Sequence, residues 1–174
     1  SVSISASANP ICSGTSVTFT ATPTNGGSSP SYQWKLNGSN VGTNSTTYTN
    51  SSLNHGDQIY CVLTSNITPC PSGNPATSGT ITMTVNALAA ITVHPANSTI
   101  CSGQNTSFSV TATGPGLIYQ WQVNTGSGYT NLSNGGVYSN VTTSVLGISG
   151  PTTTYSGYLY RCVITTTGSC SINS

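Results

Sequence analysis

A Tyr-Gln-Trp tripeptide that occurs twice constrains the fold of this chain more than any other feature. It occupies residues 32–34 and returns at residues 119–121. A Cys-Ser-Gly motif precedes each copy, and a strand-like segment with a central Cys follows each copy. An internal repeat of this kind predicts two copies of one domain. We place the first domain at residues 1–86 and the second at residues 87–174.

Short runs of alternating apolar and polar residues fill both copies, and clusters of Gly, Pro and Asn separate these runs. No window has a sustained helical period, so the pattern predicts about seven short strands per domain. Asn37-Gly38 is typical of a two-residue type I′ hairpin. The sequence therefore predicts an all-β fold of two tandem sandwich domains. The alternating runs lie at 2–4, 17–21, 32–36, 59–63 and 81–85, and again at 91–93, 108–112, 119–123, 146–148 and 160–164.

The two copies differ in length after the tripeptide. Trp34 precedes Cys61 by 27 residues, whereas Trp121 precedes Cys162 by 41, so the second copy holds 14 more (41 minus 27). These residues predict a longer loop or an added hairpin on one sheet.

The second copy also stops early. Cys70 precedes the end of the last run, Val85, by 15 residues, whereas the chain ends four residues after Cys170. The second domain is therefore expected to lack its final strand within this chain. Either the chain is a truncated piece of an array, or the open sheet edge takes a strand from another chain.

Charged residues are scarce, with two Lys+Arg and one Asp+Glu in 174 residues. This composition excludes a basic patch for nucleic acid, a pair of catalytic carboxylates and a carboxylate-rich calcium site. His55 and His94 have no cluster of metal-ligating residues at suitable spacing. No apolar run approaches the ~20 residues of a membrane-spanning helix. We expect no catalytic activity, no cofactor, no metal site and no direct membrane insertion.

Three features of each copy together resemble the immunoglobulin-like sandwich. They are a Gly-x-x-apolar-x-apolar strand, a strand with a central Trp, and a later strand with an apolar-x-Cys core. In that family the Trp packs between the sheets, and Tyr160 before Cys162 matches the family's tyrosine corner. The first family Cys would fall near Ala21 and Val110, so the usual disulfide between the sheets is absent.

The displaced cysteines point to a narrower resemblance. Six features of the chain resemble the Ig-like or PKD-like repeats of large Bacteroidetes surface proteins. They are Ile-Cys-Ser-Gly, Tyr-Gln-Trp, the run at 160–163, a third Cys in each copy, the run at 37–42 and the strand at 81–85. Such proteins include gliding-motility adhesins and other cargo of type IX secretion. The resemblance covers essentially the whole chain, and it implies stalks and adhesive repeats at the bacterial cell surface.

Six cysteines in a weakly charged, strand-rich chain indicate an oxidising compartment. We expect one bridge inside each copy that involves the upstream Cys12 or Cys101. A local Cys61–Cys70 bridge, a Cys12–Cys170 bridge between the copies, and buried free thiols remain as alternatives. The candidate disulfide cysteines, with their pairing open, are Cys12, Cys61, Cys70, Cys101, Cys162 and Cys170.

Aromatic residues provide the remaining candidate sites. Trp34 and Trp121 sit inside strands between apolar neighbours, which favours core packing over sugar stacking. Tyr129, Tyr138 and Tyr155 fall in the longer loops of the second copy, where they are expected to be exposed. Tyr is favoured at contact surfaces, so these three form the candidate contact surface.

These observations favour a non-catalytic segment of a secreted or cell-surface bacterial protein that acts as a stalk, spacer or adhesive fibre. One alternative is a carbohydrate- or protein-binding module accessory to a secreted enzyme, and another is a filament subunit assembled by strand exchange. The expected partners are neighbouring Ig-like repeats, with surface glycans or other cell-surface proteins as further candidates. The chain opens directly in a strand without an initiator Met, so we expect a fragment of a longer secreted protein.

Overall fold

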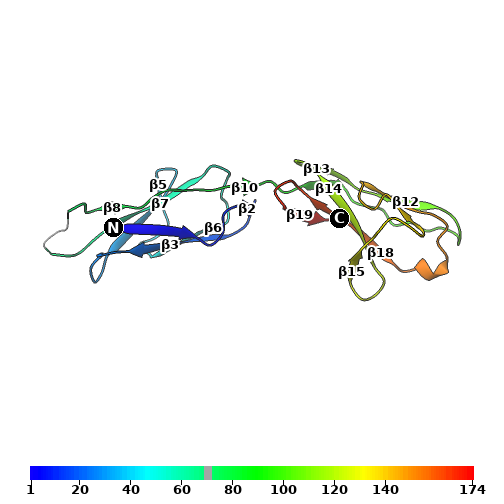
Figure 1. The fold of residues 1–174 in the computed structure, drawn as a ribbon, viewed down its shortest axis with the longest axis horizontal. Coiled ribbons are helices and arrows are strands. Elements are labelled where there is room, and N and C mark those ends of the chain that lie inside the picture. The colour runs from blue at the N-terminus through cyan, green and yellow to red at the C-terminus, as the bar shows by residue number, and fades with distance from the viewer. Residues whose placement is uncertain (69–71) are drawn as a thin grey trace. The chain divides into compact units, whose positions relative to one another are not determined.

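The chain folds into two compact units, Ser1–Asn86 and Ala87–Ser174. The structure, a computed structural model, describes residues 1–68 and 72–174. Each unit has its own hydrophobic core and is built almost entirely of short strands (Figure 1). We call them unit 1 and unit 2.

Unit 1 consists of two packed layers. In one layer the strand order is β1-β3-β6, and in the other it is β5-β4-β7 with β8 and β9 on the outer edge of β7. A short parallel pair, β2 with β10, joins the first turn to the end of the unit. The strands are β1 (Val2–Ala6), β2 (Ile11–Cys12), β3 (Val17–Pro23), β4 (Ser31–Leu36), β5 (Ser39–Val41), β6 (Thr47–Asn50), β7 (Gln58–Thr64), β8 (Ala76–Thr77), β9 (Ile81–Thr82) and β10 (Val85–Asn86).

The alternating pattern of the sequence explains how these strands face the core. In β7, Ile59, Cys61 and Leu63 are buried, while the residues between them point outwards and are partly exposed. In β3, the same alternation buries Val17 and Phe19. Successive side chains of a strand point to opposite faces, so one face of each sheet supplies the core.

The Asn37-Gly38 hairpin is confirmed. Leu36 pairs with Ser39 across it, and the two turn residues have positive φ angles of 51° and 84°. A type I′ turn requires this backbone at both central positions, which Asn and Gly adopt most readily.

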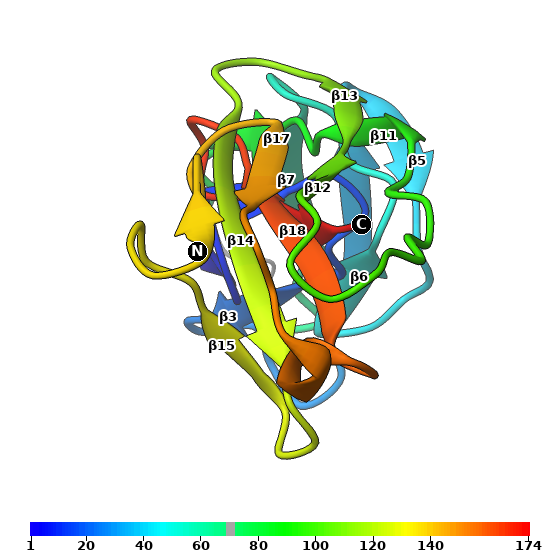
Figure 2. The same ribbon diagram turned by 90° about the vertical axis from the view of Figure 1, so that its right-hand side faces the viewer.

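Unit 2 repeats the arrangement. One layer contains the pair β11-β13 and the order β12-β17-β16, and the other has the order β15-β14-β18-β19. Figure 2 shows the long strands β14 and β18 side by side. The elements are β11 (Ala90–Val93), β12 (Thr106–Ser109), β13 (Thr111–Thr113), β14 (Ile118–Asn124), β15 (Tyr129–Asn131), β16 (Tyr138–Ser139), β17 (Val145–Ile148), the 3₁₀ helix η1 (Thr153–Tyr155), β18 (Leu159–Thr165) and β19 (Ser171–Asn173).

The longer connection of unit 2 forms extra sheet structure. The β14–β15 hairpin has a longer loop than its counterpart in unit 1, and β16 adds a strand beside β17. Val141, Leu132 and Leu146 from this region are buried in the core. The predicted longer loop is therefore present in the β14–β15 hairpin, and the added strand is β16 on the other sheet.

The last strand of unit 2 is represented only by its beginning. β19 pairs with Val163–Thr165 of β18, as β8 pairs with Val62–Leu63 of β7. Residues 87–174, all of which the structure describes, contain no counterpart of β9 or β10.

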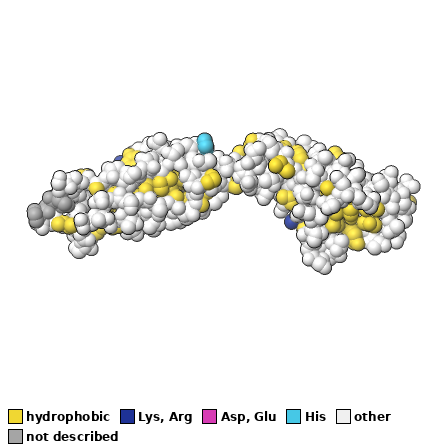
Figure 3. Space-filling model, viewed as in Figure 1, with side chains coloured by type: hydrophobic (Ala, Val, Ile, Leu, Met, Phe, Trp, Pro, Cys, Tyr) yellow, Lys and Arg dark blue, Asp and Glu magenta, His cyan; other side chains and the backbone are white. Residues whose placement is uncertain are grey.

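Strand order and core positions together confirm the predicted fold class, which is all-β with two tandem immunoglobulin-like sandwiches. Among the described residues, η1 is the only helical segment, and no helix is long and apolar enough to cross a membrane. Side chains that are neither charged nor hydrophobic, together with the backbone, dominate the face drawn in Figure 3, where hydrophobic side chains gather in a few patches and basic side chains are rare.

Candidate functional site

The repeated tryptophans lie at the centre of each core. Trp34 and Trp121 are both fully buried. Each indole Nε1–H donates a 2.9 Å hydrogen bond to a backbone carbonyl of its own unit, Ser45 for Trp34 and Thr143 for Trp121. A buried indole with its only donor satisfied inside the protein has neither a free face nor a free polar atom for a ligand.

The glutamine of each tripeptide stabilises the sheet that contains the Trp. Gln33 Nε2 donates to the carbonyls of Trp34 and Val41, at 2.9 and 3.2 Å. Gln120 Nε2 donates to the corresponding carbonyls of Trp121 and Leu132, at 2.8 and 2.9 Å. In both units the amide therefore links the Trp strand to the strand that follows it, which explains why Gln recurs here.

Three of the candidate disulfide cysteines are free thiols. Cys61 and Cys162 are buried, and Cys101 is exposed. The expected bridge from Cys101 inside unit 2 is therefore wrong, as are the pairings that use Cys61. The reason is packing, because Cys61 and Cys162 occupy the core positions opposite Trp34 and Trp121 in the strand register.

Two other cysteines, Cys12 and Cys170, are disulfide-bonded. Cys70 lies outside the described residues. The alternative of buried free thiols is thus confirmed for Cys61 and Cys162, which pack as small apolar residues.

The three free thiols are expected to differ strongly in reactivity. Burial raises the pKa of Cys61 and of Cys162 to about 11, which leaves them about 100-fold less thiolate near neutral pH than an ordinary thiol. Iodoacetamide should therefore alkylate Cys101 in the folded protein and spare Cys61 and Cys162 until urea unfolds it. Peptide mapping by mass spectrometry measures the labelling of the three cysteines separately. Labelling of Cys162 in the folded protein at the rate of Cys101 would contradict the buried position of Cys162.

The few charged side chains are engaged in local structure. The Asp57 carboxylate, the chain's single acidic side chain, accepts hydrogen bonds from the Asn37 side-chain amide and the Asn54 backbone N–H, both at 2.8 Å. Arg161 Nε donates to Gln122 Oε1 at 2.7 Å. Within residues 1–68 and 72–174, no group of three or more His, Cys, Asp or Glu side chains is placed to hold a metal ion.

The three tyrosines of the candidate contact surface do not lie together. Tyr138 and Tyr155 pack edge to face, with ring centroids 6.1 Å apart. Tyr129 lies on β15, where the guanidinium of Arg161 stacks 4.0 Å from its ring centroid. Arg161 alternates along β18 with the inward-facing Tyr160, so Tyr129 lies on the opposite face of this sheet. All three rings are half-buried, which corrects the expectation that they are exposed.

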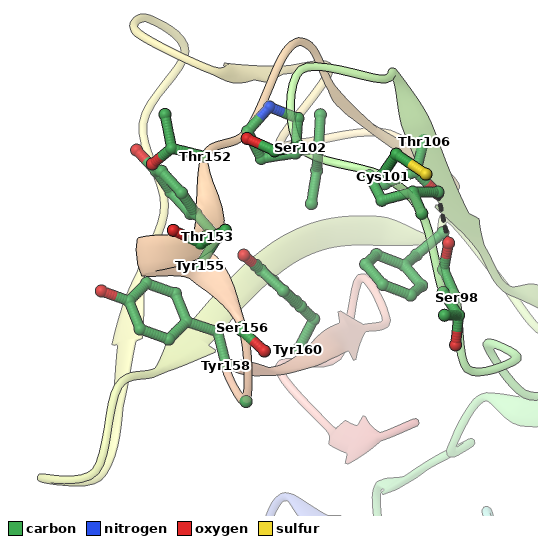
Figure 4. A pocket seen from close by; sticks show the side chains of 16 residues that line it. Ser98, Cys101, Ser102, Thr106, Thr152, Thr153, Tyr155, Ser156, Tyr158 and Tyr160 are labelled. Carbon is green, nitrogen blue, oxygen red and sulfur yellow. Dashed lines mark hydrogen bonds between the residues drawn. The ribbon is translucent and has the colours of Figure 1, made fainter.

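A groove lies between η1, β18 and the first turn of unit 2. Its volume is about 320 Å³. Tyr155, Tyr158 and Tyr160 line one side, and Cys101 lies across from them (Figure 4). We call it the tyrosine groove and define it by Ile100, Cys101, Phe108, Tyr155, Tyr158 and Tyr160.

The Tyr160 hydroxyl lies at the inner side of the tyrosine groove and bonds a neighbouring tyrosine. Tyr160 stacks on Phe108 with ring centroids 5.1 Å apart, and its hydroxyl lies 3.1 Å from that of Tyr138. The hydroxyl of Tyr160 thus bonds another side chain rather than the backbone, unlike a tyrosine corner. Burial raises the pKa of both phenols, so they stay protonated at physiological pH.

Sequence reasoning missed most of the tyrosine groove. It selected Tyr155 but not Ile100, Cys101, Phe108, Tyr158 or Tyr160 as lining residues. The available signal was the repeat itself, because Ile100 and Tyr160 correspond to Ile11 and Ile59, which pair with Val85 and Ile81 in the first copy.

No protein-family model matches this chain. No curated protein matches it either. Among solved structures, the N-terminal eight Ig domains of the Down syndrome cell adhesion molecule match with 16% identity and a TM-score of 0.57, over 100% of this chain and 24% of that one. The chain thus spans about a quarter of that structure.

Two weaker matches are also tandem Ig-domain structures. An I-band fragment of titin has 15% identity and a TM-score of 0.46, over 98% of this chain and 63% of that one. The Ig1-2 module of the Drosophila receptor protein tyrosine phosphatase DLAR has 16% identity and a TM-score of 0.39, over 99% of this chain and 94% of that one. At this identity the comparison with the adhesion molecule shows the fold alone, which is the tandem immunoglobulin-like architecture.

Proposed function

We propose that this chain is a non-catalytic structural segment of a secreted or cell-surface bacterial protein, where it serves as a stalk, spacer or adhesive fibre. One observation carries the proposal. Among the residues that recur between the two units, the Trp and the core Cys are buried in the core of their own unit, and the Gln amide bonds backbone carbonyls of its own unit. What the repeat preserves is therefore a scaffold and not a ligand-binding surface.

The composition supports a place outside the cell. A disulfide occurs mainly in proteins of oxidising compartments. The surface is rich in hydroxyl and amide groups and carries few charges. Repeated domains that contact mainly their neighbours suit extended arrays, and neighbouring Ig-like repeats are the proposed partners.

A carbohydrate- or protein-binding role is the second candidate, with surface glycans or other cell-surface proteins as ligands. The half-buried rings of Tyr155 and Tyr158 in the tyrosine groove favour it, because aromatic side chains that keep a polar tip are common at contact surfaces. Tyr129 beside Arg161 is a separate and smaller candidate contact.

A glycan-array and polysaccharide pull-down experiment tests the structural role. The whole 174-residue protein is compared with Tyr155→Ala and Tyr129→Ala, and Tyr60→Ala serves as a control in unit 1. The stalk or spacer role predicts no glycan binding above background for any of the four proteins. Binding that Tyr155→Ala or Tyr129→Ala abolishes, and that Tyr60→Ala leaves intact, would overturn it in favour of the binding module.

A further inference from the structure

Arg161 is the single Lys or Arg of unit 2, and it lies on the sheet in which β15, β14 and β18 run side by side (Figure 2). Its neighbour Cys162 is buried in the core, so Arg161 points to the outer face of this sheet. The strand register places it opposite Gln122, which in turn pairs with Asn131. Tyr129 stacks against it from the start of β15. We call Arg161, Gln122, Asn131 and Tyr129 the arginine face.

The guanidinium of Arg161 is held in one orientation by two contacts. Its carbon lies 4.0 Å from the centroid of the Tyr129 ring, a cation–π distance. Its Nε donates to Gln122 Oε1 at 2.7 Å, and Gln122 Nε2 donates to Asn131 Oδ1, also at 2.7 Å. A side chain that is already ordered loses little conformational freedom when a ligand binds. Arg161 is therefore preorganised, unlike most surface arginines.

This network leaves donors for a ligand. The amide oxygens of Gln122 and Asn131 both accept hydrogen bonds from within the arginine face. The terminal nitrogens of Arg161, the amide nitrogen of Asn131 and the hydroxyl of Tyr129 make no hydrogen bond to any residue that the structure describes. A surface that offers N–H donors and a positive charge is complementary to an anion with several acceptor oxygens.

No acidic side chain of unit 2 neutralises Arg161. Residues 87–174 contain neither Asp nor Glu. The single acidic side chain of the whole sequence, Asp57, belongs to unit 1, where it accepts hydrogen bonds from Asn37 and Asn54. The planar guanidinium matches a carboxylate with two parallel hydrogen bonds. One cation suits one carboxylate, whereas densely charged polyanions are bound by clusters of Lys and Arg.

Unit 1 shows that a sandwich of this type leaves the corresponding face open. Lys35 pairs with Tyr60 across β4 and β7. Gln122 and Arg161 form the corresponding pair of unit 2. All four side chains are half-buried. In unit 1 the following strand, β9, pairs along the edge of β7, so it widens the sheet and does not cover its outer face. The open face is therefore a property of the sandwich itself.

We propose that the arginine face binds a uronate unit of an acidic polysaccharide, with the sugar carboxylate on the terminal nitrogens of Arg161. The hydroxyls of such a sugar provide acceptors for the Asn131 amide and a partner for the Tyr129 hydroxyl. A carboxylate surrounded by hydroxyls thus satisfies every free polar group of this face. The inference rests on the adhesive form of the proposed function, to which it assigns a site and a ligand class.

The test is isothermal titration calorimetry of the whole protein with short oligogalacturonates and oligomannuronates. Oligogalacturonates with methyl-esterified carboxyls are the matched ligand control, because they keep the sugar hydroxyls and lose the charge. We expect the acid forms to bind and esterification to weaken the affinity by about tenfold or more. Amide NMR shifts should change mainly in β14, β15 and β18. Poly-glutamate and dextran sulfate, which carry anions without uronate sugars, should bind more weakly than the acid oligosaccharides.

Three protein variants locate the binding. Arg161→Gln removes the charge and the paired donors, and it is expected to weaken binding by about tenfold or more. Arg161→Lys keeps the charge but loses the planar pair of donors, so it should also weaken binding. Lys35→Gln is the matched control, because it removes the same charge from the corresponding sheet of unit 1, and it should bind normally. Equal urea midpoints of each variant and the wild type report that the fold is retained.

Several results would overturn the inference. They are absence of binding by both acid oligosaccharides, equal binding of the esterified form, equal or stronger binding of poly-glutamate or dextran sulfate, and equal loss in Arg161→Gln and Lys35→Gln. Sugar binding that requires Tyr155 but not Arg161 would also overturn it, while the adhesive function would stand. Absence of all sugar binding would remove the adhesive function as well and leave a stalk or spacer, so the two failures are distinguishable.

Discussion

Replacing Trp34 by Ala is expected to unfold unit 1 under conditions in which unit 2 stays folded. Trp34 is fully buried and contacts the rings of Phe19 and Tyr48, with centroids 6.4 and 6.0 Å away. Truncation of a buried Trp costs about 3–5 kcal/mol. A unit of this size has roughly 4–13 kcal/mol of stability in total. The change therefore removes much or all of the stability of unit 1.

The two tryptophans allow the folding of each unit to be followed separately. Each unit has one Trp, so in Trp34→Ala the remaining fluorescence reports unit 2 alone. Loss of the amide NMR signals of residues 1–86 would report the unfolding of unit 1, and Trp121→Ala should give the reciprocal result. Lys35→Ala, on the outward face of the same strand, is the control. A stability of Trp34→Ala within about 1 kcal/mol of the wild type would contradict the core position.

Replacing Met83 by Ala should produce the second largest effect. Met83 is fully buried between β9 and β10, and truncation of a buried Met to Ala costs about 2–5 kcal/mol. We expect the urea midpoint of unit 1 to fall, while that of unit 2 stays unchanged, as followed by the amide NMR signals of each unit.

Thr84→Ala is the matched control for Met83→Ala. Thr84 is the next residue along the chain, and its side chain is exposed. Its replacement should change the stability by less than about 0.5 kcal/mol. Equal effects of the two substitutions would show that the segment is not part of the core of unit 1.

Local patterns were sufficient to predict the main strands. Asn37-Gly38 determines its hairpin through backbone preference alone, and the alternation around Ile59 and Leu63 determines which face is buried. The added strand β16 was not predictable in this way. It has two residues, and its position depends on pairing with β17, which the sequence around Tyr138 does not indicate.

The candidate site was predictable only in part, because it depends on contacts between distant segments. Cys spacing gave no means of distinguishing a bridge from the buried thiols of Cys61 and Cys162, since a small apolar position accepts either. The tyrosine groove combines residues near Ile100 with residues near Tyr160, some 60 positions later. Tyr129 was grouped with Tyr138 because both lie in long loops, and strand alternation separates them.

Quenching of tryptophan fluorescence tests most directly whether the repeated tripeptide builds the two cores. Trp34 and Trp121 are both fully buried. Iodide and acrylamide should therefore quench the folded protein far less than N-acetyltryptophanamide, and urea should abolish this protection. Two single-tryptophan variants, Trp34→Phe and Trp121→Phe, give the result for each unit separately. Native quenching of either tryptophan as strong as that of the free analogue would contradict the account, because it would place that indole on the surface.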